Sequence, residues 1–370
     1  MAESRLLEVK HLVKHYPLKA GGFTFSSEKV HAVNDVSFSV HRQKTLGLVG
    51  ESGCGKTTTG RMLLRVIEPD SGRLYFNQEE NKIQTCERLY KEWQQVKNGP
   101  RARDAQRAYA LCRDESDFLA YRGRRLVQER MKMQYIFQDP YQSLDPKMHV
   151  VEIITESLVE QNMIRRADRK NIAKRYLDIV GLPADSLYKF PHEFSGGQRQ
   201  RINIARAIAL QPKFIVCDEP VSSLDVSIQS QILNLLIEIQ KELGISYLFI
   251  AHNLPVVFYI SDDVSVMYAG KIVEHGTADE LATRSLHPYT RLLMDASPEI
   301  GVPKDYLSLK DTGQVPNLIN YPEGCTFYER CPLRQDRCAV SFPPLLETLP
   351  GHYCACFVVN KDLSSEEADT

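Results

Sequence analysis

The chain has 370 residues, of which 43% are hydrophobic and 25% charged, and its 46 basic and 47 acidic residues give a net charge of −1. This length exceeds one compact core and suits a large domain with a smaller one, while the balanced charge gives no general reason to bind nucleic acid. No apolar run approaches the ~20 residues that cross a bilayer, and the amino-terminal segment lacks the apolar stretch of a signal peptide. We therefore expect a cytoplasmic protein whose membrane role comes through a partner.

The first elements lead into a glycine-rich turn. Alternating apolar residues predict strands over residues 6–13 and 36–40. Residues 45–49 are a short apolar run, typical of a buried strand, and a helix is expected over residues 57–67.

Residues 50–57, between that strand and helix, fit the phosphate-loop pattern G-x-x-x-x-G-K-[ST]. Glycines let backbone N–H groups surround a phosphate, and the helix that starts at Lys56 directs its positive end there. We expect Lys56 to reach the β- and γ-phosphates of a nucleotide and the Thr57 hydroxyl to bind Mg²⁺. A plain glycine-rich turn is disfavoured by the flanking strand and helix. The ATP-binding candidates here are Gly50, Ser52, Gly53, Cys54, Gly55, Lys56, Thr57 and Thr58.

Residues 78–130 are rich in charged side chains, with apolar residues at helical spacing and a break at Asn98-Gly99-Pro100. This pattern predicts an insertion of two or more helices, whose charged surface is most simply a solvated face.

Regular elements resume after the insertion. The pattern predicts strands over 133–137, 214–217 and 246–251, helices within 150–180 and over 198–210 and 228–243, and a hairpin over 264–274. This alternation predicts a mostly parallel sheet covered by helices. After Pro288 the chain turns to loops, prolines and cysteines, which indicates a second unit ending in a disordered acidic tail at 364–370.

Asp218 and Glu219 end the predicted strand at 214–217. Near a triphosphate, Asp218 would hold Mg²⁺ and Glu219 would orient and deprotonate the attacking water, because adjacent carboxylates raise each other's basicity. Taken alone, the pair could be solvated acids at a strand end.

Ser195-Gly196-Gly197-Gln198 precedes a helix, with Ser195 as a natural N-cap and two glycines that permit close backbone approach. This geometry suits a second anion site. Simple helix capping is the alternative, although a capped helix does not require two glycines.

These three segments together resemble the ATP-binding cassette (ABC) ATPases, and the chain is most similar to the ATPase subunits of oligopeptide and dipeptide importers. Residues 50–56, 137–140, 222–226 and 287–290 match that subgroup. Two features depart from the family pattern. Phe194 stands where most ABC proteins carry Leu. The insertion at residues 78–130 is not typical of the family, so the resemblance implies no role for it.

The resemblance implies an α/β fold: an ABC-type P-loop ATPase domain over residues 1–290, with a mixed sheet core and a helical subdomain at about 140–210. A Cys-rich C-terminal extension would cover residues 291–370.

The resemblance also implies roles for single residues. Gln138 would contact Mg²⁺ and the attacking water, His252 the γ-phosphate, and Tyr16 would stack on adenine. The segment Ser195, Gly196, Gly197 and Gln198 would close over ATP held by a second subunit, and Asp225 would lie in a loop at that dimer interface.

The partners implied are a second, non-identical ATPase subunit, two transmembrane permease subunits and, indirectly, an extracytoplasmic substrate-binding protein, at the cytoplasmic face of the membrane. Relatives import nickel or glutathione instead of peptides. A soluble ABC ATPase acting on DNA or ribosomes is a competing hypothesis, disfavoured by the neutral charge, and a catalytically dead regulatory subunit is disfavoured because Lys56, Asp218, Glu219 and His252 are all present.

Five of the nine cysteines crowd into the last part of the chain, and crowded cytosolic thiols suggest a metal before disulfides. Spacing alone does not separate zinc, iron–sulfur and metal-free thiols. The resemblance implies a [4Fe–4S] cluster on Cys325, Cys331, Cys338 and Cys356, with Cys354 where the family usually has an apolar residue.

Overall fold

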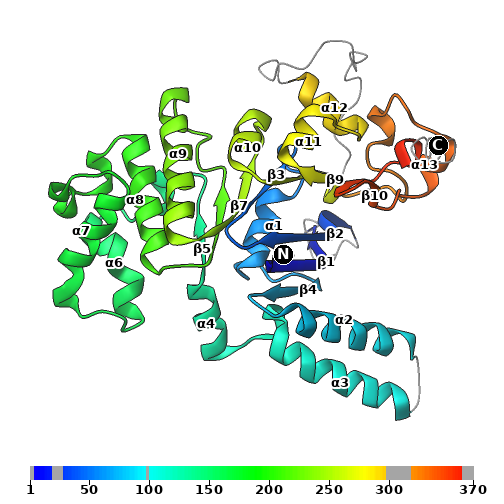
Figure 1. Cartoon of the computed structure of the whole chain (residues 1–370), viewed down its shortest axis with the longest axis horizontal. Coiled ribbons are helices and arrows are strands. Elements are labelled where there is room, and N and C mark those ends of the chain that lie inside the picture. The colour runs from blue at the N-terminus through cyan, green and yellow to red at the C-terminus, as the bar shows by residue number, and fades with distance from the viewer. Residues whose placement is uncertain (1–3, 19–27, 97–99, 297–317, 361–370) are drawn as a thin grey trace. The chain divides into compact units, whose positions relative to one another are not determined.

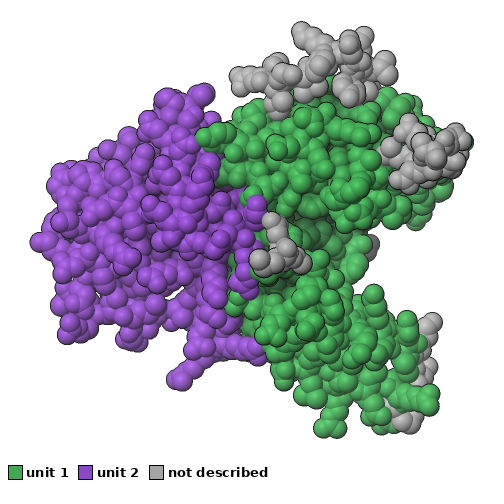
Figure 2. All heavy atoms as spheres, viewed as in Figure 1, with its two compact units in different colours: residues 1–41, 46–121, 252–370 green, residues 42–45, 122–251 purple. Residues whose placement is uncertain are grey.

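The structure is a computed structural model that describes residues 4–18, 28–96, 100–296 and 318–360. The chain divides into two units, which Figure 2 colours separately. Unit 1 comprises residues 1–41, 46–121 and 252–370, and unit 2 comprises residues 42–45 and 122–251.

Unit 1 contains two groups of paired strands. In the first, β1 (Arg5–Pro17) pairs antiparallel with both β2 (Lys29–His41) and β4 (Ser71–Phe76). In the second, the neighbours in order are β10 (Leu346–Leu349), β11 (His352–Cys354), β9 (Lys271–Thr277), β8 (Asp263–Tyr268) and β3 (Thr45–Val49). β3 is buried along its whole length, as its continuous apolar run predicts.

The helices of unit 1 follow or connect these strands (Figure 1). They are α1 (Lys56–Leu63), α2 (Glu80–Gln95), α3 (Pro100–Ser116), α10 (Leu254–Ile260), α11 (Ala278–Thr283), α12 (Pro288–Asp295) and α13 (Asp336–Val340), with 3₁₀ turns η1 (Phe118–Ala120) and η5 (Tyr328–Arg330).

Unit 2 combines three parallel strands with a set of helices. The strand order is β7 (Ser246–Ala251), β6 (Phe214–Asp218), β5 (Met133–Ile136). The helices are α4 (Gly123–Met131), α5 (Pro140–Ser143), α6 (Val150–Glu160), α7 (Arg169–Ile179), α8 (Gly196–Ala209) and α9 (Val226–Leu243), with 3₁₀ turns η2 (Arg166–Asp168), η3 (Ala184–Tyr188) and η4 (Pro191–Glu193). α9 ends where Gly244 takes a left-handed conformation, with φ of 65°.

The strand pairs are mixed. β3 pairs parallel with β8, and β5, β6 and β7 are parallel, as strand–helix alternation predicts, whereas β8 pairs antiparallel with β9. β8 and β9 form an antiparallel hairpin because only Ala269 and Gly270 separate them, both with positive φ. A two-residue turn of this kind cannot lead to a parallel neighbour, which needs a long crossover. The mixed sheet that the family resemblance implies is the arrangement observed.

The first helix is shorter than expected, because α1 ends at Leu63 rather than near Ile67. Arg65 takes a left-handed conformation with φ of 52°, and its buried guanidinium donates to the carbonyl of Tyr121 at 2.7 Å. The left-handed backbone at Arg65 interrupts the helical conformation, so α1 does not extend to Ile67.

The insertion forms an α2–α3 hairpin (Figure 1). The small core between the two helices also includes Tyr75 of β4. Ile83 and Cys86 of α2 are buried against Tyr109 of α3, with Trp93 partly buried beside them. The expectation of helices is met, but one face of the hairpin is packed rather than solvated. The predicted break at Asn98-Gly99 lies outside the described residues.

The described part of the C-terminal segment joins the strands of unit 1. Tyr353 and Cys354 of β11 pair antiparallel with His275 and Glu274 of β9. Residues on both sides of position 290 belong to unit 1. The expected boundary between an ATPase domain at 1–290 and an extension at 291–370 remains a prediction. The expected acidic tail lies outside the described residues.

Candidate functional site

The phosphate loop of unit 1 connects β3 to α1, as predicted. At Gly55, with φ of 109°, an added Cβ would overlap the carbonyl oxygen of Ala32 in β2. At Gly50 it would overlap the carbonyl oxygen of Met267 in β8. Two strands therefore press against this loop, and only glycine fits at either point.

The side chain of Lys56 lies inside the loop. Its ammonium donates to the carbonyl oxygen of Gly50 at 2.7 Å and to that of Glu51 at 2.9 Å. The Cys54 thiol lies 3.7 Å from the same ammonium, and burial raises the pKa of this thiol although Lys56 opposes the shift. The position of the lysine is thus set by the backbone at the start of the loop.

Glu51 is itself anchored on both sides. Its backbone N–H donates to the Tyr289 hydroxyl at 2.9 Å. Its carboxylate forms a two-pronged salt bridge with Arg330, in which Nη1 and Nη2 each lie 2.9 Å from one oxygen. Neither Tyr289 nor Arg330 was assigned a role from sequence.

Tyr16 lies in β1 and is half-buried, opposite Val30 of β2. Ala32, whose carbonyl faces Gly55, is two positions along the same β2 strand. Tyr16 thus stands on the strand next to the one that contacts the phosphate loop. Ser52 and Gly53 are exposed at the turn, while Thr57 and Thr58 are half-buried in the first turn of α1.

In unit 2, Asp218 is buried at the carboxyl end of β6. Tyr135 of the neighbouring strand β5 donates its hydroxyl hydrogen to the Asp218 carboxylate at 2.7 Å. Sequence reasoning missed Tyr135, whose contact follows from the parallel pairing of β5 and β6, in which Tyr135 faces Val216.

Glu219 and Gln138 come together although they are far apart in sequence. The Gln138 amide donates to the Glu219 carboxylate at 3.0 Å. Glu219 has a left-handed backbone with φ of 46°, held by its N–H, which donates to the carbonyl of Ile250 at 2.9 Å. A non-glycine residue in this conformation costs about 1–3 kcal/mol, so the neighbouring strand compensates for a strained position. His252, which follows β7, is exposed.

Ser195 caps α8 as predicted. Its hydroxyl accepts from the Gln198 N–H at 3.3 Å, and the Gln198 side chain accepts from the Ser195 N–H at 3.0 Å. The two glycines also have a packing reason, which the sequence analysis did not identify. A Cβ at Gly197 would lie 2.6 Å from Ile228 of α9, and one at Gly196 would lie 3.3 Å from Leu224. The start of α8 and the loop around Asp225, the N-cap of α9, are therefore neighbours.

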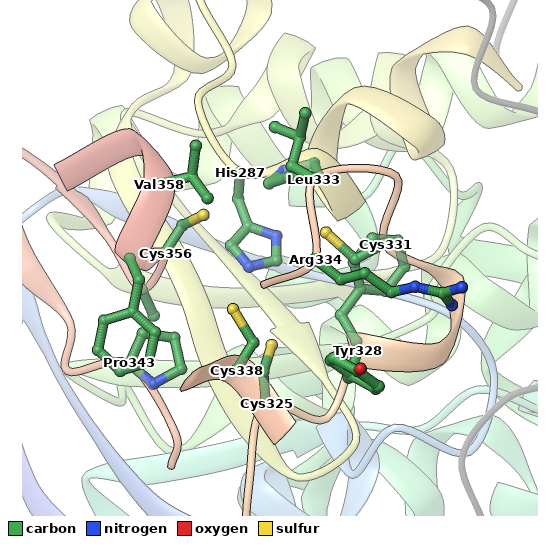
Figure 3. A pocket seen from close by; sticks show the side chains of 14 residues that line it. His287, Cys325, Tyr328, Cys331, Leu333, Arg334, Cys338, Pro343, Cys356 and Val358 are labelled. Carbon is green, nitrogen blue, oxygen red and sulfur yellow. The ribbon is translucent and has the colours of Figure 1, made fainter. Parts of the chain in front are cut away.

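Four cysteines of the C-terminal segment line one pocket in unit 1. Figure 3 shows the sulfur atoms of Cys325, Cys331, Cys338 and Cys356 turned toward a shared space beside His287. Cys354 does not line this pocket and is buried nearby. The four lining cysteines are the four that the family resemblance selects.

Three thiols of this pocket, those of Cys325, Cys331 and Cys356, have a raised pKa and favour the neutral form. Burial raises the pKa of Cys325 to about 12 and that of Cys331 to about 11, and the neighbouring thiols add to both shifts. Within the described ranges, however, no group of three or more His, Cys, Asp or Glu side chains is arranged to hold a metal ion. The residue types and their convergence fit a four-thiolate centre, while the sulfur positions in this structure do not form one.

Among the residues that the structure describes, no helix is both long enough and apolar enough to span a membrane.

Comparison with known proteins places the chain in a family. The family model described as "ABC transporter" matches residues 33–222, and the one described as "Oligopeptide/dipeptide transporter, C-terminal region" matches residues 273–338. A Brucella ovis protein is 42% identical over 358 residues, covering 96% of this chain and 98% of that protein. The dipeptide transport ATP-binding protein DppF of Escherichia coli is 38% identical over 357 residues, covering 96% of this chain and 95% of that protein.

Solved structures agree on the fold. The cbiO1 protein of Clostridium perfringens, part of the ABC transporter complex cbiONQ, has a TM-score of 0.55 and 23% identity, covering 75% of this chain and 91% of its own. A dimeric ATP-binding cassette, MJ0796 bound to ADP and phosphate, has a TM-score of 0.56 and 20% identity, covering 74% of this chain and 98% of its own. From the family models and the identity to its relatives, the chain belongs to the ABC transporter family and carries the oligopeptide/dipeptide transporter C-terminal region.

Proposed function

We propose that this chain is the ATP-hydrolysing subunit of a membrane importer of di- or oligopeptides. One observation carries the proposal: an ABC transporter match and an oligopeptide/dipeptide C-terminal match lie in the same chain, at residues 33–222 and 273–338. The DppF proteins of Escherichia coli and Haemophilus influenzae, both 38% identical, are named for dipeptide transport. ATP hydrolysis itself follows from membership of the ABC family.

The phosphate loop is proposed to bind ATP. Lys56 would exchange part of its contact with the Gly50 and Glu51 carbonyls for the β- and γ-phosphates, while the N–H groups at the start of α1 face the same charge. Tyr16 is proposed to stack on adenine. Thr57, Asp218 and Gln138 are proposed as Mg²⁺ ligands, because each carries a side-chain oxygen of the kind that Mg²⁺ prefers, and the ion when bound would neutralise charge on the phosphates.

Glu219 is the proposed general base for hydrolysis. Its contact with Gln138 places an amide beside the carboxylate that would accept the proton of the attacking water. His252 is proposed to donate to the γ-phosphate. Catalysis would rest on positioning and charge stabilisation, as is general for phosphoryl transfer.

A complete site is proposed to need a second ATPase subunit. Ser195 is exposed at the start of α8, where a helix N-terminus favours an anion, and Asp225 lies in the adjacent loop. Ser195, Gly196, Gly197 and Gln198 would then face ATP bound to the partner subunit.

Coupling to transport is proposed to run through the segment after Gln138. Tyr141 of α5 is 62% exposed, which leaves an aromatic surface for a permease subunit at the cytoplasmic face of the membrane. Two permease subunits, a non-identical second ATPase and an external substrate-binding protein complete the proposed assembly.

The four-cysteine pocket is proposed to hold a [4Fe–4S] cluster on Cys325, Cys331, Cys338 and Cys356, with zinc as the alternative. Four thiols in one pocket support a metal centre. Loading would require the thiols to ionise and the side chains to move into a ligand arrangement. A metal centre bound by four cysteines would cross-link the loop-rich C-terminal segment and stabilise its fold.

Reconstitution tests the proposed function. The chain would be purified with the permease and ATPase subunits that accompany it, placed in vesicles with the binding protein, and supplied with labelled dipeptide, oligopeptide, glutathione or nickel. ATP-dependent uptake of peptide supports the proposal. Uptake of nickel or glutathione alone would correct the substrate, and the absence of co-purifying permeases would contradict transport.

A soluble ABC ATPase acting on nucleic acid is the second candidate. Exposed arginines of the insertion and α4, including Arg101, Arg107 and Arg124, are the feature that favours it. Binding to duplex DNA that weakens steeply with salt, measured on the chain alone, would support this alternative over transport.

A further inference from the structure

We propose that Arg330 is a positioning residue for the phosphate loop: a side chain from the C-terminal segment that fixes Lys56 through Glu51. The inference rests on the proposed binding of ATP at residues 50–57. It assigns to the C-terminal segment a direct part in nucleotide binding, in addition to any metal that it carries.

The first link is the salt bridge between Arg330 and Glu51. Both oxygens of Glu51 are engaged, at 2.9 Å each, by the two terminal nitrogens of the guanidinium. The Arg330 side chain is 3% exposed and that of Glu51 is 25% exposed. A two-pronged pair in which one partner is buried fixes direction as well as distance, unlike a solvated surface pair.

The second link joins Glu51 to Lys56. The carbonyl oxygen of Glu51 accepts from the Lys56 ammonium at 2.9 Å. The same residue that Arg330 holds by its side chain therefore holds the phosphate-binding ammonium by its backbone. A shift of Glu51 would move a ligand of Lys56 and alter the position of the positive charge.

The third link is the packing that makes Arg330 rigid. Its guanidinium donates to the Tyr268 hydroxyl at 3.3 Å and lies 5.6 Å from the ring centre of Phe327. Tyr289, which accepts from the Glu51 N–H, packs on both rings, with centres 4.4 Å from Tyr268 and 5.5 Å from Phe327. These contacts hold the Arg330 side chain in the position from which it reaches Glu51.

Arg330 also connects the loop to the four-cysteine pocket. It directly precedes Cys331, and Phe327 lines the same pocket as the four thiols. The folded state of the C-terminal segment and the shape of the phosphate loop are thus linked through one side chain.

A double-mutant cycle tests this inference on the full-length chain. Affinity for ATP with Mg²⁺ would be measured by calorimetry for wild type, R330A, E51A and the double variant. KM and kcat for hydrolysis would be measured in parallel on the complex of each variant with the partner ATPase subunit. We expect each single variant to weaken ATP binding about tenfold and the double variant to be no weaker, because both remove one interaction. KM should rise while kcat changes little, since the link acts on binding.

Two further variants separate positioning from folding. R330K keeps the charge and loses the two-pronged geometry, so it should weaken ATP binding while keeping the wild-type melting temperature. R334A removes an exposed arginine of the same segment and should bind ATP like wild type.

The inference would be overturned if R330K and R330A bound ATP with wild-type affinity. It would also be overturned if the loss of ATP affinity in the double variant equalled the product of the losses in the two single variants. The same holds if R330A and E51A weaken binding only in step with a lower melting temperature. If the wild-type chain bound no ATP, the proposed function would fail together with the inference, which distinguishes that outcome from the others.

Discussion

Tyr135 and Asp218 meet across two parallel strands, with the phenol hydroxyl 2.7 Å from the buried carboxylate. Asp218 is proposed to bind Mg²⁺, so Tyr135 holds a metal ligand in place from a neighbouring strand. A hydrogen bond to a charged group contributes more than one between neutral groups.

Removing that hydroxyl should weaken both the fold and the reaction. We expect Tyr135→Phe to lower the free energy of unfolding by about 1.5–3 kcal/mol, because the buried carboxylate loses a donor. Hydrolysis should need a higher Mg²⁺ concentration. Urea unfolding and a Mg²⁺ titration of the ATPase rate measure both effects. Tyr188→Phe, at a 58% exposed tyrosine, is the matched control, and equal behaviour of the two variants would contradict this role.

The contact between Gln138 and Glu219 leads to a second prediction. Glu219→Gln keeps an oxygen that can accept from the Gln138 amide and removes only the basic carboxylate. We expect hydrolysis to fall by roughly 100-fold or more while ATP stays bound, measured by phosphate release and by calorimetry. Glu238→Gln, at an exposed glutamate of α9, should hydrolyse ATP normally. Appreciable steady turnover in Glu219→Gln would remove Glu219 as the base.

Stability should fall in mild acid because of His275. Burial, with the nearby His352 and His41, lowers its pKa to about 4, and its Nδ1 lies 2.9 Å from the Ser265 hydroxyl. Since the unfolded histidine has a pKa of about 6.5, the unfolded state binds more protons between those values. Stability therefore drops as pH falls from about 6.5 to about 4.

The matched variants isolate this effect. His275→Gln should lose less stability than wild type over that pH range, by about 2–3 kcal/mol in urea unfolding. His11→Gln, at an exposed histidine paired with Asp35, should follow wild type. Identical acid profiles for wild type and His275→Gln would contradict the assignment.

The insertion carries its own fluorescent reporter. Trp93 is the sole tryptophan of the sequence, and its ring stacks on Tyr109 with centres 5.3 Å apart. Tyr109→Ala should open the α2–α3 core, shift the emission of Trp93 to longer wavelength and leave ATP hydrolysis unchanged. Leu111→Ala, at a 62% exposed position of the same helix, should leave the emission unchanged. Loss of hydrolysis in Tyr109→Ala would show that the insertion supports the ATPase.

Metal content tests the four-cysteine pocket. Anaerobically purified wild type should contain iron and absorb at about 400 nm, and Cys338→Ser should lose both. Cys354→Ser is the control, because Cys354 is buried nearby but does not line the pocket. Zinc without colour would correct the metal, and wild type without metal would exclude the centre.

The elements that sequence predicted well depend on local pattern. Three elements are specified by contiguous residues: the phosphate loop, the buried strand before it and the capped helix at Ser195. Residue type and spacing were therefore sufficient to predict them. The hairpin at Ala269-Gly270 was also predicted from its local pattern, and β8 and β9 pair antiparallel around it.

The interactions that were missed join residues distant in sequence. Tyr135 reaches Asp218 because β5 and β6 pair. Arg330 reaches Glu51 because the C-terminal segment packs against the phosphate loop within unit 1. Neither residue has a local signal, since tyrosine in a strand and arginine in a loop are ordinary. The strands β10 and β11 were also missed, because they have only four and three residues and are specified by pairing, β10 with β11 and β11 with β9.

The pairing of β11 with β9 has a practical consequence for shortened forms of the protein. A chain that ends before His352 would lack β11. The backbone of Glu274 and His275 would then form an unpaired edge of β9 that can pair with strands of other molecules. We expect truncated forms to aggregate through this exposed edge. The C-terminal segment therefore protects β9 and should be kept when the protein is expressed.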